Sequence, residues 1–253
     1  MILERFRLTD RAAIVTGAGR GIGAASAVAL ADAGADVVIT ARTEEQLQEV
    51  AEQIEMPGDL NDLDVMARLV EAAVATYGRL DVVVNNHGGW MPRPLLEVSA
   101  GHLERAFRYN VGSAHALIRA AVPAMLEGDG GAVVNISSMA GRVAPRGFLA
   151  YGTAKAALSH YTRLAAAELA PRIRVNAIAV GTVATSAIDM VVQDDAMRAF
   201  IEETALVRRI GQPEDIAAAV VYLASPASDF VTGKIFEIDG GAERPQVDLG
   251  GGT

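Results

Sequence analysis

Short runs of apolar, β-branched residues alternate with longer alanine-rich segments, and this alternation limits the folds open to the chain. The apolar runs lie at residues 12–17, 35–40, 81–86, 132–137, 173–180 and 234–239. They are apolar nearly throughout, which is typical of strands buried on both faces of a parallel sheet. The segments with helical spacing lie near residues 22–33, 44–54, 62–77, 99–127, 151–170 and 213–224. This order, with right-handed crossovers, predicts a doubly wound α/β fold with a mostly parallel sheet.

The chain of 253 residues is long enough to bury a sizeable core, and no Pro-, Ser- or Gly-rich linker divides it. We therefore expect a single domain over residues 1–253, with a C-terminal tail at 242–253 that is frayed from Gly250. The net charge of −9 and the lack of a basic stripe argue against a nucleic-acid partner. A small anionic ligand remains compatible with this charge through a local positive site.

The chain contains no cysteine, which excludes disulfides, thiol catalysis and thiolate metal sites, and we predict no metal. The start, M-I-L-E-R-F-R-L-T-D, is charged and has no apolar run of signal-peptide length. The longest uncharged stretches, such as 175–188, are too short and too polar to cross a bilayer. We expect a soluble, cytoplasmic protein with no membrane partner.

The first apolar run ends in a glycine-rich loop, T-G-A-G-R-G-I-G at residues 16–23, directly before a helical segment. Glycine allows a tight turn and a close approach to a pyrophosphate, and a helix N-terminus supplies N–H donors. The loop fits two spacings, G-x-G-x-x-A from residue 19 and G-x-x-x-G-x-G from residue 17. Within a strand–helix–strand unit it favours a dinucleotide over a simple turn, as in a Rossmann-type domain. Its candidate cofactor-binding residues are Gly17, Gly19, Arg20, Gly21, Ile22 and Gly23.

The end of the second apolar run bears on which dinucleotide binds. Units that bind NAD usually carry an acid there, hydrogen-bonded to the ribose 2′-OH, but this chain has Ala41. Asp36 opens the run, and at about 3.3 Å per residue it lies roughly 16 Å from the binding edge. Arg42 follows Ala41, and together with Arg20 it can clamp a 2′-phosphate. We predict that NADP(H) is preferred, with NAD(H) as the alternative if Arg42 is a solvated loop residue.

A tyrosine and a lysine lie four residues apart in Y-G-T-A-K, residues 151–155, which puts them on one face of a helix. Taken alone, the pair is better explained as two chance neighbours on a helix. A free tyrosine, with a pKa of about 10, is a poor base at neutral pH, and a nearby ammonium stabilises its phenolate form. Hydride exchange with a nicotinamide needs such a proton carrier for the substrate oxygen.

Five ordered motifs resemble those of the classical short-chain dehydrogenase/reductase family. They are the glycine loop, N-N-H-G at 85–88, Asn110, N-I-S-S at 135–138 and Y-G-T-A-K at 151–155. The resemblance extends from about Asp10 to Gly241 and includes R-V-N-A-I-A-V-G at 174–181 and F-E-I-D-G-G at 236–241.

The resemblance implies a role for each matching residue. Tyr151 matches the catalytic acid/base, and Lys155 matches the lysine that binds the nicotinamide ribose and lowers the tyrosine pKa. Ser138 matches the hydrogen-bond partner of the substrate oxygen. Asn110 matches the asparagine that orders a water between the lysine and solvent. Further cofactor contacts are implied for Asn86, Gly88, Gly181 and Thr182, the last at the carboxamide.

Three places depart from the family pattern. Val180 stands where the family has a proline before Gly181, which predicts a less rigid strand end. His87 replaces the alanine of N-N-A-G, and we expect a hydrogen-bonded loop residue rather than a proton relay or substrate contact. Residues 51–64 leave little room for the family's third strand, so that strand is truncated or a loop is missing. Asp59 is the expected adenine contact.

Substrate residues are expected in the loops at the carboxyl ends of the strands. The predicted pocket residues are Trp90, Met139 and Phe148, with Arg142 as a further candidate and 184–209 as a mobile lid. Their apolar character favours a bulky or apolar ketone, although the same residues suit a contact with a second subunit. The family resemblance also implies a homotetramer.

Together these features predict an NADP(H)-dependent enzyme that interconverts a ketone and a secondary alcohol, a carbonyl reductase or alcohol dehydrogenase. One alternative is a 3-oxoacyl-(acyl-carrier-protein) reductase, although the acidic L-E-G-D at 126–129 lies where such enzymes tend to be basic. A second alternative is a hydroxysteroid dehydrogenase. A third is a catalytically silent dinucleotide-binding sensor, against which the intact set of motif residues argues.

Overall fold

The computed structural model describes all residues except 42–45, 47–62, 187, 189–192 and 248–253. In the described chain, six parallel strands form one sheet in the order β2-β1-β3-β4-β5-β6. The strands are β1 (Ala12–Thr16), β2 (Asp36–Thr40), β3 (Val82–Asn85), β4 (Gly131–Ser138), β5 (Ile173–Val180) and β6 (Ile235–Ile238). Each lies in one of the apolar runs, so the predicted parallel, doubly wound sheet is confirmed.

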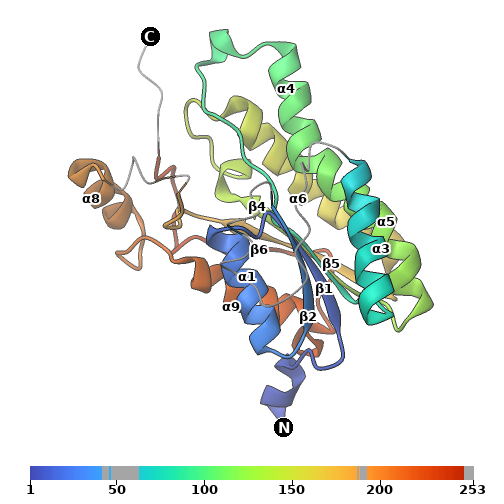
Figure 1. Cartoon of the computed structure of the whole chain (residues 1–253). Helices are drawn as coiled ribbons and strands as arrows, with labels where there is room; N and C mark the ends of the chain where they lie inside the picture. Colours follow the sequence, from blue (N-terminus) through green and yellow to red (C-terminus); the bar gives the residue numbers. More distant parts are fainter. Residues whose placement is uncertain (42–45, 47–62, 187, 189–192, 248–253) are drawn as a thin grey trace.

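Helices cover both faces of this sheet (Figure 1). On one face, α1 (Gly21–Asp32) packs against α9 (Pro213–Ala224). On the other face lie α3 (Asp64–Tyr77), α5 (Ser113–Glu127) and α6 (Leu149–Leu169). The remaining α-helices are α4 (Ala100–Phe107), which packs on α6, and α8 (Asp195–Thr204). Short 3-10 turns are η1 (Ile2–Phe6), η2 (Leu95–Glu97), η4 (Met139–Gly141) and η5 (Pro226–Ser228).

The strands β1 to β5 supply side chains to two apolar cores. In β1, Ala13 and Val15 belong to the core beneath α1 and α9, whereas Ile14 belongs to the core beneath α3 and α5. In β3, Val84 and Val83 divide in the same way. Successive residues of a strand point to opposite faces, so a strand covered on both faces has no polar side. This explains the nearly uninterrupted apolar runs.

The structure differs from the predicted helices in two places. The segment 99–127 is not one regular helix, because a π-helical turn, η3 (Arg108–Gly112), separates α4 from α5. Within the predicted lid, α8 begins at the cap Asp194, whose side chain accepts a hydrogen bond from the Met197 N–H at 2.9 Å. The predicted helix near 44–54 and the truncated third strand lie outside the described residues. Among the helices that the structure describes, none is long and apolar enough to cross a membrane.

The strand order creates a crevice at the carboxyl edge of the sheet. The chain passes from β1 to β2 on one side and later to β3 on the other, so β1 lies between them. Crossovers leave β1 and β3 in opposite directions, and ligands of doubly wound sheets bind at such a switch point. The loops that carry the predicted site residues follow β1, β3, β4 and β5.

A buried carboxylate fixes the opposite, amino edge of the sheet. Asp81, with 5% of its side chain exposed, accepts hydrogen bonds from Arg11 Nη1 and Arg79 Nε at 2.7 Å and from the Ala12 N–H at 2.9 Å. Burial raises the pKa of this carboxyl, but hydrogen bonds from Arg79, Ala12 and Arg11 outweigh burial and hold the pKa below its usual value. Its stabilising contribution is therefore present above the pKa of the unfolded chain and is lost as the pH falls.

We expect Asp81→Asn to lower the free energy of unfolding by about 2–3 kcal/mol at neutral pH, because two guanidiniums lose their carboxylate partner. The difference from wild type should shrink as the pH falls from about 5, where the Asp81 carboxyl of the unfolded wild type begins to bind a proton while that of the folded protein is still ionised. Urea denaturation followed by circular dichroism measures both effects. Asp129→Asn is the control, since this exposed carboxylate lies 3.8 and 3.7 Å from the same arginines. Equal losses in the two variants would contradict the assignment.

Candidate active site

The glycine loop after β1 depends on three of its glycines. Gly17 and Gly21 have φ angles of 65° and 57°, in the left-handed region. A Cβ on Gly23 would lie 2.3 Å from the Gly17 carbonyl oxygen, so only glycine lets α1 approach the loop this closely. The structure therefore favours the G-x-x-x-G-x-G spacing. Gly19 faces the end of β2, where a Cβ would lie 3.0 Å from the Cβ of Ala41.

The surroundings of this loop fit the phosphates of a dinucleotide. Asn86, after β3, donates from Nδ2 to the carbonyls of Thr16 and Gly17 at 2.9 and 3.0 Å and so fixes the turn. The first N–H groups of α1 lack helical partners, and exposed Arg20 precedes them. Ile22 lies in this first turn. The absence of side chains at Gly17 and Gly21 keeps the backbone open to a pyrophosphate.

Tyr151, Lys155 and Ser138 come together where β4 ends and α6 begins. Ser138 is the last residue of β4, and its side chain is hydrogen-bonded to that of Tyr151. The Lys155 ammonium lies 5.7 Å from the centre of the Tyr151 ring and donates to the Ile136 carbonyl at 2.8 Å. Lys155 is only 3% exposed. Two chance neighbours on a helix surface would not explain why Lys155 is buried beside Ser138, the last residue of β4.

Hydrogen bonds from β4 hold α6 in this orientation. Ser137 donates to the Lys155 carbonyl at 3.0 Å and lies 2.8 Å from the Ser159 hydroxyl. Asn135 donates to the Thr162 hydroxyl at 2.9 Å. Residues 151, 155, 159 and 162 recur every three or four positions, so they share one helix face. That face is turned towards the carboxyl half of β4.

Asn110 lies beside this cluster in the π-helical turn between α4 and α5. Its Nδ2 donates to the Ala106 and Gly89 carbonyls at 2.9 and 3.0 Å, and its Oδ1 accepts from the Gly89 N–H at 2.9 Å. A Cβ on Gly88 would lie 2.7 Å from Asn110 Oδ1 and 2.9 Å from Lys155 Nζ. Gly88 thus permits the loop after β3 to approach both side chains. Turns of this type frequently occur at functional sites.

Burial is the largest influence on the pKa values of Tyr151 and Lys155. Burial raises the pKa of Tyr151, while the hydrogen bond with Ser138 acts in the opposite direction and is the weaker effect. Burial lowers the pKa of Lys155 to about 8. In this state the phenol is protonated at neutral pH and lies next to an ammonium, so it is able to release a proton to a bound acceptor.

The strand end after β5 carries Gly181 and Thr182. The Gly181 N–H donates to the Ile238 carbonyl at 3.0 Å, and the Thr182 N–H donates to Gln246 Oε1 at 3.2 Å. Val183 forms a parallel bridge with Gly211, whose hydrogen bonds use the neighbours Thr182 and Ala184. The N–H and C=O of Val183 therefore point away from Gly211.

Sequence reasoning did not find Thr185 or Gln246. A Cβ on Gly21 would lie 3.1 Å from Thr185 Cγ2, which puts this threonine against the glycine loop. Thr185 follows Gly181 by four residues, and that spacing was the only sequence signal for it. Gln246 lies in the predicted C-terminal tail, before the part expected to fray, and no sequence pattern indicates its burial.

The predicted pocket residues differ in their surroundings. Phe148 caps α6 with its ring centre 6.2 Å from that of Tyr151, and Met139, 7% exposed, follows Ser138. Trp90 is partly buried against an alanine cluster of α4 and α6. Arg142 forms ion pairs with Glu237, Asp239 and Glu243 at 3.1–3.9 Å. It therefore ties the turn after η4 to the C-terminal segment, and its place in a substrate pocket stays a prediction.

His87 and the two cofactor candidates after β2 complete the comparison with the sequence. The His87 N–H donates to the Thr16 hydroxyl at 3.0 Å, and its ring centre lies 4.2 Å from that of Tyr109. This agrees with a hydrogen-bonded loop residue. Arg42 and Asp59 lie outside the described residues. No group of three metal-ligating side chains occurs in the part of the chain that the structure describes.

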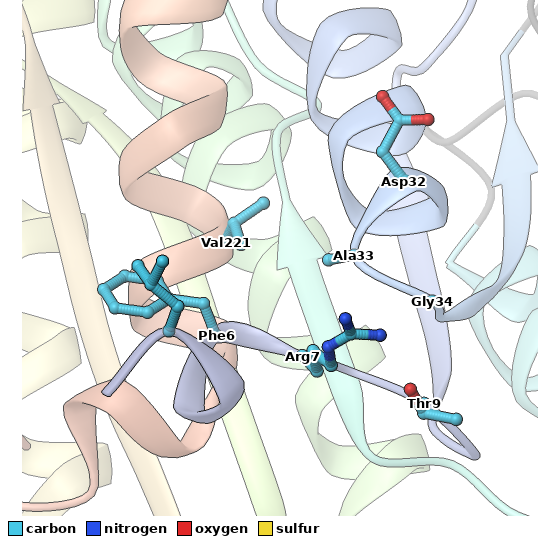
Figure 2. Close-up of a pocket in the computed structure, with 8 residues that line it drawn as sticks. Phe6, Arg7, Thr9, Asp32, Ala33, Gly34 and Val221 are labelled. Carbon is cyan, nitrogen blue, oxygen red and sulfur yellow. The ribbon is translucent and has the colours of Figure 1, made fainter. Parts of the chain in front are cut away.

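A separate hollow of about 360 Å³ lies at the other edge of the sheet. Figure 2 shows its lining by Phe6 and Arg7 at the end of η1, by Val221 of α9 and by the turn after α1. Thr9 and Gly34, also in the lining, precede β1 and β2. The hollow therefore lies at the amino ends of the strands, away from Tyr151.

Comparison with known proteins agrees with this arrangement. Residues 17–243 match the family described as "Enoyl-(Acyl carrier protein) reductase". An uncharacterized oxidoreductase of Mycobacterium tuberculosis is 57% identical, over 98% of this chain and 98% of that protein. The 7alpha-hydroxysteroid dehydrogenase of Escherichia coli is 34% identical, over 94% and 96% of the two chains.

Two solved structures are similar throughout. A 7 alpha-hydroxysteroid dehydrogenase complexed with NADH and 7-oxo glycochenodeoxycholic acid has a TM-score of 0.90 at 33% identity, covering 95% of this chain and 97% of that one. A gluconate 5-dehydrogenase from Burkholderia cenocepacia, in complex with NADP and tartrate, has a TM-score of 0.88 at 30% identity, covering 96% and 98%.

The fold and the site define an oxidoreductase with a Rossmann-type sheet. The chain belongs to the short-chain dehydrogenase/reductase family, whose members bind a nicotinamide dinucleotide.

We expect Gly23→Ala to raise the dissociation constant of the dinucleotide by about 100-fold, because the new Cβ displaces the Gly17 carbonyl and opens the loop. Isothermal titration calorimetry measures the change. Gly128→Ala is the control, since its Cβ would meet only the Met125 carbonyl at 3.7 Å, in ordinary contact. Unchanged binding by folded Gly23→Ala protein would refute the close-packing argument.

Proposed function

We propose that this chain interconverts a ketone and a secondary alcohol, with NADP(H) as its preferred cofactor. The observation that carries the proposal is the contact of a strand-end serine with a partly buried tyrosine that has a buried lysine one helical turn away. Ser138, Tyr151 and Lys155 share one end of α6 at the carboxyl edge of the sheet. The glycine loop supplies the dinucleotide side of the same edge.

The proposed reduction assigns one task to each group. The bound dinucleotide supplies hydride to the carbonyl carbon. Tyr151 releases its phenolic proton to the carbonyl oxygen, which becomes the alcohol hydroxyl, while Ser138 donates a hydrogen bond to the same oxygen. Lys155 stabilises the phenolate left on Tyr151 until a proton from water restores it. Oxidation of the alcohol runs through the same groups in reverse.

The position of Asn110 supports a route for this returning proton. Its amide is held by Gly89 and Ala106, close to the Gly88 backbone that separates it from Lys155. An immobile polar group beside a buried ammonium is suited to ordering water. We assign Asn110 to this task, and Asn86, Gly88, Gly181 and Thr182 to the cofactor side of the site.

The preference for NADP(H) rests on charge at the end of β2. Ala41 lies against Gly19 and carries no carboxylate that would bind a free 2′-hydroxyl. Arg20 before α1 and Arg42 after Ala41 supply positive charge for a 2′-phosphate. The two similar structures contain NADH and NADP respectively, so likeness alone does not select a cofactor.

An apolar substrate is favoured by the loops near the site. Met91 and Leu96 after β3, and Leu206 after α8, are 73%, 92% and 75% exposed. With Phe148 beside Tyr151, they support a bulky apolar ketone. A hydroxysteroid dehydrogenase is the second candidate, since two of the similar proteins carry that name. Carrier-protein-linked substrates are less favoured, because exposed Glu127 and Asp129 end α5.

The assembly of the protein is a separate proposal. The exposed fractions of Leu103 and Phe107 on α4 and of Leu164 on α6 are 38%, 49% and 54%. These apolar side chains support association through this pair of helices, in a cytoplasmic homotetramer.

We expect Tyr151→Phe to lower ketone reduction about 10³-fold while the dinucleotide affinity changes little, because the variant loses only the proton carrier. The loss of reduced-dinucleotide absorbance measures turnover, on aliphatic, aromatic and steroid ketones with NADPH and with NADH. Tyr161→Phe, ten positions further along the same helix, is the control and should retain activity. Undiminished turnover by Tyr151→Phe would overturn the mechanism. Dinucleotide binding by wild type without turnover of any ketone would favour the silent sensor.

We expect the rate of ketone reduction to be level at neutral pH and to fall as the pH rises through about 8, where buried Lys155 loses its charge. Above this pH, Tyr151 has to release its proton without a neighbouring ammonium to stabilise the phenolate that remains. Initial rates at saturating dinucleotide, measured between neutral and alkaline pH, test this. A reduction rate that increases through the same range would contradict the assigned role of Lys155.

A further inference from the structure

The C-terminal segment of the described chain places one side chain between two separate parts of the site. Gln246 is 3% exposed. Its Oε1 accepts a hydrogen bond from the Thr182 N–H at 3.2 Å, and its Nε2 donates to the Ile201 carbonyl at 3.4 Å. Thr182 belongs to the strand end after β5, whereas Ile201 lies in α8. A single amide therefore joins these two segments.

This segment is itself held in place. Arg142 donates to the Ala242 carbonyl at 2.9 Å, and Ala242 is 1% exposed. The Val207 N–H donates to the Gly240 carbonyl at 3.2 Å. The Arg244 guanidinium lies 6.0 Å from the centre of the Phe200 ring. Gln246 is thus attached to a chain segment that is secured from the turn after η4, from α8 and from the turn that follows α8.

The two hydrogen-bond partners of Gln246 differ in whether they keep another partner when the Gln246 amide is removed. The Ile201 carbonyl also accepts from the Thr204 hydroxyl at 3.0 Å and from the Ala205 N–H at 3.2 Å, so it stays satisfied without Gln246. The Thr182 N–H has no such second acceptor among the described residues. Removal of the Gln246 amide therefore mainly affects the strand end after β5. At this strand end Val180 lacks the fixed φ angle of a proline.

We propose that Gln246 is a positioning residue that holds Gly181–Val183 in the conformation that meets the nicotinamide end of the cofactor. The side chain restrains a strand end that has no proline and ties it to α8, so that the two segments are ordered together. The inference rests on the proposed function in one respect, namely that the loop after β5 contacts the nicotinamide. In this proposal Gln246 acts through Thr182 and Ile201 rather than by direct contact with the cofactor or the substrate.

The test is a comparison of two ligands that differ only at the nicotinamide. Calorimetry measures binding of the intact dinucleotide and of the fragment without nicotinamide, which is ADP-ribose or 2′-phospho-ADP-ribose. In Gln246→Met, which keeps the volume and removes both hydrogen bonds, the dissociation constant of the intact dinucleotide should rise about tenfold. The affinity for the fragment should stay within about twofold, because the glycine loop is untouched. A general loss of structure would weaken both ligands equally.

Gln193→Met is the matched control, because Gln193 is exposed and precedes the same helix α8. It should change neither affinity. If Gln246→Met does not fold, Gln246→Asn serves instead, since its amide is one methylene shorter and does not span both partners. Equal loss of both ligands, or no loss of the dinucleotide, overturns the inference. If Gln246→Met selectively lost affinity for the intact dinucleotide but the wild type turned over no ketone, the proposed reaction would be overturned. The role of Gln246 would stand.

Discussion

The attachment of α6 to β4 is the interaction on which the rest of the site depends. Asn135 and Ser137 point from a central strand into the helix and bond Thr162 and the Lys155 carbonyl. Asn135 also accepts from Asn85 of β3 at 2.8 Å, so three elements share one buried polar network. Buried polar groups without partners are costly, and such a network accordingly admits few helix orientations. The rotation of α6 that satisfies it also turns Tyr151 and Lys155 towards Ser138.

Close approach of backbones then brings the other groups within reach. A Cβ on Gly152 would lie 2.7 Å from the Ala140 carbonyl, and one on Gly141 would lie 2.7 Å from the Ala156 N–H. The turn after Ser138 therefore packs directly on α6. Gly88 acts likewise between Asn110 and Lys155. The polar groups of the site meet because the segments between them lack side chains, and this accounts for the several glycines that lie outside the dinucleotide loop.

The sequence predicted those parts of the fold and site that depend on local pattern. All six strands follow from apolar runs, and Ser138, Tyr151 and Lys155 from ordered motifs. The division of segment 99–127 was missed, because the π-helical turn at Asn110 depends on Gly89 in another loop. The ion pairs of Arg142 were also missed, because its acidic partners Glu237 and Asp239 are about a hundred residues distant in sequence. Contacts of this kind leave no periodicity in either segment.

The two halves of the site are held by different means. The groups proposed to carry the proton, Tyr151 and Lys155, depend on β4 and α6, which are adjacent in sequence and joined by buried hydrogen bonds between regular elements. The strand end after β5 is held instead by Gly211 and by Gln246, from segments that lie beyond α8. Displacement of α8 therefore acts on the loop through Gln246 while α6 and β4 keep their contacts. A fold built in this way can adjust the loop after β5 without moving Tyr151 and Lys155, the groups proposed to transfer the proton.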